Sequence, residues 1–441
     1  MKTSIGQSLH EFALQLYPIC RSITGGGVRE TLRLIGGRVP LQIHEVPSGS
    51  RVFDWRVPLE WNIEDASITD ADGARVVDFR AHNLHIVSYS EPVSAIYPLA
   101  EIESHLHSEP EHPDWIPYRT SYYRRAWGFC LPHRDRLRLR PGRYRVEVRS
   151  SLQPGSLTYG EARVPGRSRE EIIIFTHVCH PSLANDNTSG MAIATALACW
   201  LAGQPRRYTY RVVFAPGTIG SLCWLKKNER QLGRIRHGLV LGLLGDPGPL
   251  TYKRSRRGDS EIDTVAEYVL TGIDAAARII GFSPYGYDER QLCSPGFNLP
   301  VGRLTRSVNG GYPQYHTSAD DLSLIRPAHL QQSYEACQGI ISVLEQNRRY
   351  VNLKPKGEPQ LGKRGLYGSV GGGNPLEREQ ALLWVLNQSD GTRSLLDITR
   401  RAQLRFDAVS EAACALEGAR LLRRVRAAGA SQGRGKVGKR R

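Results

Sequence analysis

The sequence predicts an α/β protein whose mostly parallel central sheet is flanked by helices. It also predicts a small all-β domain inserted near the N-terminus and a helix-turn-helix or winged-helix domain at the C-terminus. Three observations support this. From residue 170, apolar strands alternate with long helices, as in parallel sheets. Between residues 46 and 141, short runs alternate with a period of two, as in half-buried strands. After residue 376, short helical segments follow at helix-turn-helix spacing.

The N-terminal residues 1–45 are assigned to the main domain. Apolar residues recur at helical spacing between residues 4 and 36, and a glycine turn at residues 25–27 divides them into two helices. No apolar run reaches the roughly 18 residues that a membrane span needs. The charged, amphipathic start differs from a signal peptide. We therefore expect a cytoplasmic protein with no membrane association.

The main domain continues over residues 142–352 as four strand–helix pairs. Each predicted strand is a short apolar run, and the helix that follows it is longer and periodic. The strands are 170–178, 207–216, 237–245 and 299–304; the helices are 191–204, 221–235, 261–282 and 326–347. Sheets of this kind bind ligands outside the carboxyl ends of their strands. Candidate functional residues are therefore those that directly follow a strand.

Beyond the main domain the composition changes twice. Residues 353–375 are rich in Gly, Pro and Lys and are predicted to be a linker. Residues 376–426 form the predicted winged-helix-like domain. Residues 427–441 form a basic tail that is predicted to be disordered.

The formal net charge is +16, from 59 Lys and Arg residues against 43 Asp and Glu residues. Such an excess invites a nucleic-acid interpretation. Because much of it is arginine spread along the chain and in the tail, we interpret it as a matter of composition and do not expect a nucleic-acid partner. The eight cysteines are dispersed without a Cys-x-x-Cys pair, which argues against a disulfide framework and a zinc ribbon.

The segment THVCHPSLANDNTSG, residues 176–190, joins the first main-domain strand to its helix. It contains His177, His180 and Asp186, while Asp246 follows the third strand and His316 follows the fourth. Imidazole and carboxylate together suit Zn²⁺, which can lower the pKa of a water molecule to about 7. Each histidine alone could be an ordinary hydrogen-bonded loop residue. As a set at strand ends they predict a zinc site.

A second ionisable cluster lies in YGYDERQ, residues 285–291. Glu289 is the first candidate for a general base and Asp288 the second, and a salt-bridged loop is the structural alternative. A base must come within hydrogen-bond distance of the water that it deprotonates, and the sequence does not show that distance.

Three arginines are candidates for binding a substrate carboxylate, because a guanidinium presents a bidentate fork. They are Arg290, Arg303 and Arg306. Tyr312 and Tyr315 could form a wall of the substrate pocket. Each of these residues could also be an ordinary surface or packing residue.

Two further groups have structural alternatives. Asp320 and Asp321 follow His316 closely and are expected to cap the next helix, or Asp320 could orient His316 from outside the metal. His105, His107 and His112 lie in the predicted β-domain and form a weaker candidate for a metal site.

Several of these segments together resemble a known family. NDNTSG after a strand that ends in His, a later strand-end Gly-Asp, and YHTSADDL resemble the zinc exopeptidases of the leucyl-aminopeptidase and glutaminyl-cyclase superfamily. Nearly end to end, the chain is similar to aminopeptidase-like proteins with an inserted β-module and a C-terminal winged helix. The segments that carry this closer resemblance include YPICRSITGGGVRETL, TSYYRRAWGFC, GTIGS and DERQLCSPGFNLPVG.

The resemblance implies roles for four residues. His177 matches the first histidine ligand, and Asp186 matches the carboxylate that bridges two zinc ions or binds one. Asp246 matches the strand-end carboxylate of the second metal. His316 matches the C-terminal histidine ligand.

The sequence departs from the superfamily in two places. Cys179 stands where the superfamily has an acid, and Pro216-Gly217 stands where it has paired glutamates, one a general base and one a ligand. His180 could compensate as a ligand. One zinc ion is therefore favoured over two, held by His180 or His177 together with Asp186 and His316.

These inferences predict a zinc-dependent hydrolase, aminopeptidase-like or amidase-like. It would cleave an amide or peptide-like bond of a small-molecule or peptide-like substrate, with the water activated by the metal. We expect a homo-oligomer that acts in a biosynthetic pathway. The alternatives are a degenerate exopeptidase fold with a binding or regulatory role, and a one-zinc acyl transferase or cyclase.

Overall fold

The computed structural model describes residues 4–366 and 375–425. The chain divides into two compact units, Met1–Ile340 and Ile341–Arg441. None of the helices in the described segments is long and apolar enough to cross a membrane. The predicted tail, residues 427–441, and part of the predicted linker lie outside the described residues.

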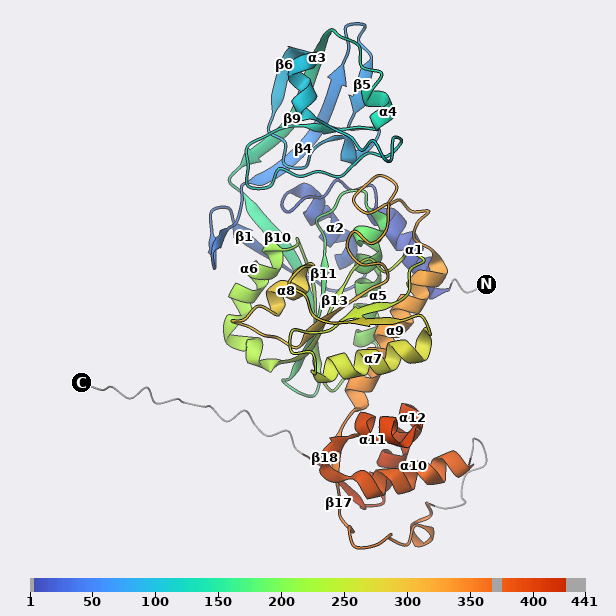
Figure 1. The fold of residues 1–441 in the computed structure, drawn as a ribbon. Helices are drawn as coiled ribbons and strands as arrows, with labels where there is room; N and C mark the ends of the chain where they lie inside the picture. The colour runs from blue at the N-terminus through green and yellow to red at the C-terminus, as the bar shows by residue number, and fades with distance from the viewer. Residues whose placement is uncertain (1–3, 367–374, 426–441) are drawn as a thin grey trace, which may run out of the picture. The chain divides into compact units, whose positions relative to one another are not determined.

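The first unit is built around an eight-stranded sheet with the order β1-β10-β12-β11-β13-β16-β14-β15 (Figure 1). The four strands β12, β11, β13 and β16 run parallel, and the edges contain antiparallel pairs. This confirms the predicted α/β fold. The bounds are β1 (Gln42–Pro47), β10 (Ser156–Val164), β11 (Glu171–His177), β12 (Thr209–Ala215), β13 (Ile235–Leu241), β14 (Thr251–Lys253), β15 (Arg278–Ile280) and β16 (Val301–Thr305).

Helices flank this sheet as predicted. The strand β11 and most of the apolar helix that follows it, α5, are buried, because both are covered on all sides. In Figure 1, α1 and α5 lie together, and α6 lies beside α8. The bounds are α1 (Ile5–Leu16), α2 (Gly26–Gly36), α5 (Gly190–Ala202), α6 (Ile219–Asn228), η4 (Glu229–Arg234), α7 (Glu261–Ile273), α8 (Asp288–Leu292) and α9 (Pro327–Gln346).

The predicted helix over residues 261–282 is wrong in its second half. Helix α7 ends at Ile273, and residues 278–280 form the edge strand β15, which pairs with β14. The Asp274 side chain explains the break: its carboxylate accepts hydrogen bonds from the backbone N–H groups of Ala276 (2.9 Å) and Leu250 (3.2 Å). Such side-chain bonds offer the backbone an alternative to the helix.

The inserted β-module has a four-stranded antiparallel sheet with the order β5-β4-β9-β6. The predicted boundary at residue 141 is too early, because β9 pairs with β4 and turns Tyr144, Val146 and Val148 into the module's core. The bounds are β4 (Glu60–Thr69), β5 (Arg75–Asp78), β6 (Val93–Pro98) and β9 (Arg143–Gln153). The smaller elements are β2 (Arg51–Val52), β3 (Trp55–Arg56), η1 (Asn83–His85), α3 (Leu99–Ile102), η2 (Glu103–His105), β7 (Leu106–His107), β8 (Phe129–Cys130) and α4 (His133–Arg136).

The second unit has the helix–strand composition of a winged helix. Its sheet has the order β18-β17-β19, so β17 belongs here and not to the main domain, whose predicted end at residue 352 is too late. Ser394 and Asp397 form a capping box at the start of α11, which fixes where that helix begins. The bounds are β17 (Arg349–Asn352), η5 (Gly362–Arg364), α10 (Pro375–Gln388), β18 (Asp390–Ser394), α11 (Leu395–Ala402), α12 (Phe406–Gly418) and β19 (Leu422–Arg424).

A bidentate ion pair ties the inserted module to the main domain. Glu60, at the start of β4, accepts hydrogen bonds from Nη1 and Nη2 of Arg29 in α2, at 2.7 and 2.6 Å. The backbone N–H of Ser156 in β10 donates to the same carboxylate at 2.9 Å. A side chain at Gly155 would overlap with Glu60, so the close approach requires glycine there.

We predict that the Glu60→Gln variant loses stability in a pH-dependent way. Hydrogen bonding to Arg29 lowers the pKa of Glu60 to about 2, from an ordinary value of 4.5. A depressed folded-state pKa means that the stabilisation is complete above about pH 4.5 and disappears as the pH falls towards 2. At pH 7 the variant should lose about 1.5–3 kcal/mol of unfolding free energy, measured by urea denaturation.

Glu64→Gln is the matched control, because Glu64 is an exposed glutamate on the same strand. It should change stability by less than about 0.5 kcal/mol. If Glu60→Gln lowers the free energy of unfolding as much at pH 3 as at pH 7, this account of the ion pair is contradicted.

Candidate metal centre

The segment between β11 and α5 gathers two imidazoles around one carboxylate. His177 is the last residue of β11, and Asp186 lies in the irregular turn η3 (Ala184–Ser189). Nε2 of His177 lies 2.7 Å from Oδ1 of Asp186, and Nδ1 of His180 lies 3.4 Å from the same oxygen. All three residues are buried. Within the described part of the chain, they form the one group of three or more side chains with the spacing of metal ligands.

His316 reaches the same carboxylate from the loop that follows β16. Its Nε2 lies 3.0 Å from Oδ2 of Asp186. His316 has a φ of 58°, a left-handed conformation that non-glycine residues adopt sparingly. The backbone N–H of Tyr118, in the inserted module, donates to the His316 carbonyl at 2.8 Å, and Pro117 pairs with Thr317. The inserted module therefore helps to hold this histidine in place.

The protonation of this cluster suits metal binding. Burial lowers the pKa of His177 to about 4 and also lowers that of His316, so both imidazoles are neutral at pH 7. Burial alone would raise the pKa of Asp186, but His180 and His177 outweigh it and hold the pKa well below its usual range. Neutral imidazoles and an ionised carboxylate are the forms that bind a metal ion.

One atom of the cluster lacks a partner. Nδ1 of His180 is buried and has no hydrogen-bond partner, although it faces Oδ1 of Asp186. A buried polar atom without a partner costs about 1–3 kcal/mol. A metal ion between these donors would supply the missing partner. The nitrogen and oxygen donor set therefore fits zinc.

Two buried residues, Arg21 and Asp320, hold the donors in place. Nε of Arg21 donates to the His180 carbonyl at 2.9 Å. Asp320 accepts the backbone N–H groups of Asn185 (2.6 Å) and Asp186 (3.0 Å), so it fixes the turn that presents Asp186. Asp320 therefore neither caps the next helix nor contacts His316, contrary to both sequence expectations. The sequence analysis did not single out Arg21.

Asp246 does not join the cluster. Its carboxylate accepts hydrogen bonds from the Asn185 amide (2.8 Å), the Gly248 N–H (2.7 Å) and the Ser307 hydroxyl (2.6 Å). Its lone pairs are therefore already used to hold loops together. We leave Asp246 out of the ligand set, which weakens the case for a second metal ion.

Tyr287 occupies the space beside Pro216-Gly217, where the superfamily has its paired glutamates. A side chain on Gly217 would overlap with the Tyr287 ring. That ring lies 4.1 Å from the ring of His177, and its hydroxyl lies 3.3 Å from Sγ of Cys179 and 3.4 Å from Nε2 of His180. Burial raises the pKa of Tyr287 well above 10, so the phenol stays protonated.

Burial also raises the pKa of the Cys179 thiol, to about 12. Cys179 is therefore a neutral thiol at pH 7 and neither a nucleophile nor a ready metal ligand. Tyr287 was not predicted as a site residue, because its role depends on contact with Gly217, which lies far from it in the chain. Only the small residues at positions 216 and 217 hinted that a bulky side chain takes their space.

The two acids of the 285–291 segment have different environments. Glu289 is buried and ion-paired with Lys253, at 2.8 Å. Burial alone would raise the pKa of Glu289, but Arg303 and Lys253 lower it. Asp288 is fully buried with the Ser221 hydroxyl beside it, and burial raises its pKa to about 7. A general base works best with a pKa near the operating pH, so the pKa of Asp288 suits that role better than that of Glu289.

The other predicted substrate-binding residues lie in different surroundings. Tyr315 stacks on His316, with ring centroids 3.9 Å apart, so it borders the cluster. Arg306 donates to the Gly248 carbonyl and to Gln332. Arg290 is half-buried, and its Nε has no hydrogen-bond partner. Arg303 lines a separate cavity that is described below.

Two of the three weaker histidine candidates pack against aromatic rings. His105 stacks on Trp127 at 3.7 Å and His112 stacks on Trp115 at 4.0 Å. Neither they nor His107 belong to the ligand group found among the described residues.

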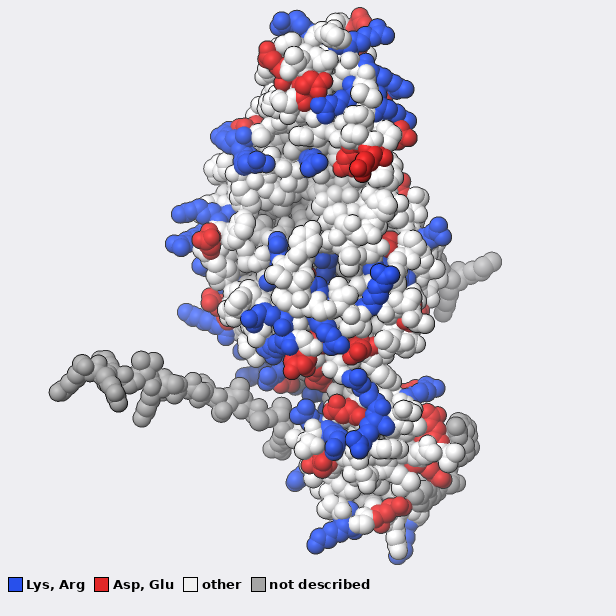
Figure 2. Space-filling view, viewed as in Figure 1, with Lys and Arg blue, Asp and Glu red and all other residues white. Residues whose placement is uncertain are grey.

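Figure 2 shows basic and acidic side chains intermingled on the viewed face. Exposed Arg424 in the winged-helix unit pairs with Glu417 at 2.6 Å. That no nucleic acid binds stays a prediction.

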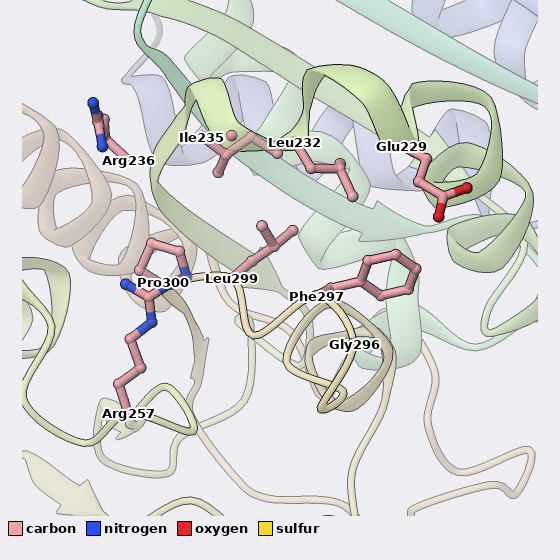
Figure 3. Close-up of a pocket in the computed structure, with 10 residues that line it drawn as sticks. Glu229, Leu232, Ile235, Arg236, Arg257, Gly296, Phe297, Leu299 and Pro300 are labelled. Atoms are coloured by element: carbon pink, nitrogen blue, oxygen red, sulfur yellow. The ribbon is translucent and has the colours of Figure 1, made fainter. Parts of the chain in front are cut away.

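A depression of about 320 Å³ lies away from the cluster (Figure 3). Leu232, Ile235, Phe297 and Leu299 form its apolar part, and Ile235 is the first residue of β13. The depression therefore lies at the amino end of that strand, whereas His177 ends β11 at the opposite edge of the sheet. Open α/β sheets bind ligands at the carboxyl edge, which favours the histidine cluster as the functional site.

Comparison with known proteins identifies the family. Residues 10–347 match the family described as a domain of unknown function, DUF4910, and residues 348–424 match a winged helix-turn-helix family. The chain belongs to the DUF4910 family. A Clostridium acetobutylicum protein, provisionally named a polysaccharide biosynthesis protein with an aminopeptidase-like domain, is 47% identical over 421 residues, covering 95% of this chain and 97% of that protein.

Solved structures share the fold of this chain. The crystal structure of a provisionally assigned peptidase from Clostridium acetobutylicum matches with a TM-score of 0.90 and 46% identity, covering 95% of this chain and 96% of that one. A zinc aminopeptidase from Bacillus subtilis matches with a TM-score of 0.56 and 11% identity, over 77% of this chain and 94% of that one. The second match shows the fold alone. Together they confirm the predicted zinc-exopeptidase-like fold and the aminopeptidase-like family.

We predict that Gly217 and Tyr287 are energetically coupled. Gly217→Ala should cost about 1–3 kcal/mol of unfolding free energy, because the new methyl group overlaps with the Tyr287 ring. In a Tyr287→Ala background the ring is gone, and the same substitution should cost less than about 0.5 kcal/mol. Chemical denaturation of the four proteins of this double-mutant cycle measures the coupling.

Gly233→Ala is the matched control, because a methyl group at Gly233 meets no atom within 4 Å. It should change the free energy of unfolding by the same amount in the parent and in the Tyr287→Ala background. If Gly217→Ala costs as much without Tyr287 as with it, Tyr287 is not what excludes a side chain at position 217.

Proposed function

We propose that this protein is a metal-dependent hydrolase that uses one zinc ion to cleave an amide or peptide-like bond in a small substrate. The observation that carries the proposal is the unpartnered Nδ1 of His180 facing a buried carboxylate that two other imidazoles also contact. Asp186 and His316, together with His180 or His177, are the residues that would hold the ion, so that one position stays open to water. The zinc-exopeptidase-like fold supports the choice of reaction, and the name of the Clostridium relative supports a biosynthetic setting.

A bound zinc ion would polarise a carbonyl group and lower the pKa of a water molecule to about 7. This chain's own residues supply the rest of the chemistry. The protonated Tyr287 hydroxyl lies beside His180 and can donate a hydrogen bond to negative charge that develops on the substrate. Asp288 has a pKa of about 7 and can accept a proton and return it to the leaving amine. Burial of the cluster limits the access of bulk water.

Zinc content is the first test. Purified parent protein should contain roughly one zinc ion per chain by elemental analysis, and Asp186→Asn and His316→Ala should bind zinc at least about 100-fold more weakly, because they remove direct ligands. His112→Ala is the control: it removes an imidazole that stacks on Trp115, and it should keep the parent zinc content. Parent protein without stoichiometric zinc would contradict the proposed function and favour a degenerate site with a binding role.

The pH dependence of hydrolysis tests the role of Asp288. Because the pKa of Asp288 is raised to about 7, its ionised, proton-accepting form predominates above that pH. The kcat/KM for an aminoacyl anilide should therefore fall as the pH drops below about 7. Asp288→Asn should lose about 100-fold or more in kcat at pH 8 and should lose this limb of the profile. Glu289→Gln should keep the limb, and an unchanged profile in Asp288→Asn would assign the base elsewhere.

A further inference from the structure

A cavity of about 200 Å³ lies over β14 and β16, on the same sheet as the candidate metal centre. Thr251 pairs with Thr305, and Lys253 pairs with Arg303, across these antiparallel strands. Since alternate residues of a strand share a face, these four polar side chains lie on one face of the pair. All four line the cavity, together with Asn309 and residues of the 280–286 segment.

The charges beside this cavity do not balance. Lys253 and Arg303 are both buried, and Glu289 is their shared counter-ion, 2.8 Å from Nζ of Lys253 and 4.0 Å from Nη1 of Arg303. The residues that line the cavity include both cations and no acid. Among the described residues these two buried cations share one ion-paired carboxylate, and buried charge without a close counter-ion is costly.

Arg303 also has an unused donor. Its Nη2 donates to Oδ1 of Asn309 at 2.7 Å, but its buried Nε has no hydrogen-bond partner. A guanidinium is built to hold two oxygens of one carboxylate. Both the charge and the free donor are therefore suited to an anionic group in the cavity.

Arg303 connects the cavity to the candidate metal centre. Its counter-ion Glu289 accepts a hydrogen bond from the backbone N–H of Tyr287 at 3.0 Å, and the Tyr287 ring lies 4.1 Å from the ring of His177. Arg303 also belongs to β16, the strand whose following loop carries Tyr315 and His316. The cations of the cavity are therefore connected to the histidine cluster through Glu289 and Tyr287, and through the loop that follows β16.

We propose that this cavity binds a carboxylate of the substrate, with Arg303 and Lys253 as the ion-pairing residues. The identification of the bound molecule as the substrate rests on the proposed function; the anion site itself does not. A carboxylate carries one negative charge, which together with Glu289 balances Lys253 and Arg303. A phosphate monoester carries about −1.5 to −2 at pH 7 and would leave an excess of negative charge. The volume suits a carboxylate-bearing fragment and not a whole ligand.

Binding of butyrate to the full chain tests this proposal, with butyramide as its uncharged analogue and inorganic phosphate as the competing anion. Saturation-transfer NMR should detect butyrate at millimolar concentrations and not butyramide, and phosphate should bind more weakly. Arg303→Met should weaken butyrate binding at least about tenfold, the loss expected for a charged hydrogen bond. Arg254→Met is the matched control. It removes the same charge from the residue that follows Lys253, where Arg254 pairs with Glu267 at 3.2 Å.

Asn309→Asp is a second variant that is expected to fold, because Asn309 is partly exposed. It places a carboxylate on Arg303 and should abolish butyrate binding while leaving the melting temperature close to that of the parent. Butyrate held by a metal ion would keep its affinity in Arg303→Met and in Asn309→Asp, and that result would overturn the proposal. Equal losses in Arg303→Met and Arg254→Met would overturn it too, as would phosphate binding at least as tightly as butyrate.

Zinc measured on the same samples separates the two proposals. Arg303→Met should keep the parent zinc content, because Arg303 is not among the proposed ligands. Zinc without butyrate binding would overturn the carboxylate site and leave the hydrolase proposal standing. Butyrate binding without zinc would support the carboxylate site and contradict the hydrolase proposal.

Discussion

The arrangement of this protein depends on one buried carboxylate. Asp186 lies at the carboxyl edge of the parallel sheet, where burial would drive it to the neutral form if it had no partners. His177, His180 and His316 surround it, Asp320 binds its backbone, and the inserted module holds His316. The first strand of the parallel core, the loop after β16 and the inserted module therefore meet at one charged group. The ends of the strands bring the three imidazoles to this position. The buried negative charge of Asp186 is stable only with such partners.

The chain differs from the superfamily that it resembles in the side chains beside the candidate metal centre. Three acidic residues of the superfamily are absent, and Tyr287 and His180 are present. Small residues at 216 and 217 leave a space that the Tyr287 ring fills, and Cys179 is a neutral thiol beside it. The loss of three acidic positions lowers the negative charge available to a second metal ion. An additional imidazole, His180, adds a nitrogen donor in their place. This exchange is the physical reason for favouring one zinc ion over two.

The parts of the fold and site that could be predicted are those set by local pattern. Apolar strands followed by polar residues indicated that His177, Asp186 and His316 would lie at one edge of a parallel sheet, because parallel strands end together. Contacts between distant segments could not be predicted. The overlap of Tyr287 with position 217 and the pairing of Lys253 with Glu289 depend on loops far apart in the chain. That pairing and the raised pKa of Asp288, about 7, are the reasons why Asp288 suits the role of the base better than Glu289.

Zinc K-edge X-ray absorption of the zinc-loaded protein tests the central claim most directly, because it reports the atoms bound to the metal. A site made of Asp186, His316 and His180 or His177, with one water molecule, should show only nitrogen and oxygen neighbours at about 2.0–2.2 Å, with the outer scattering of imidazole rings. The signal should disappear in Asp186→Asn. A sulfur neighbour at about 2.3 Å would place Cys179 on the metal and contradict the account, and so would a shell without imidazole scattering.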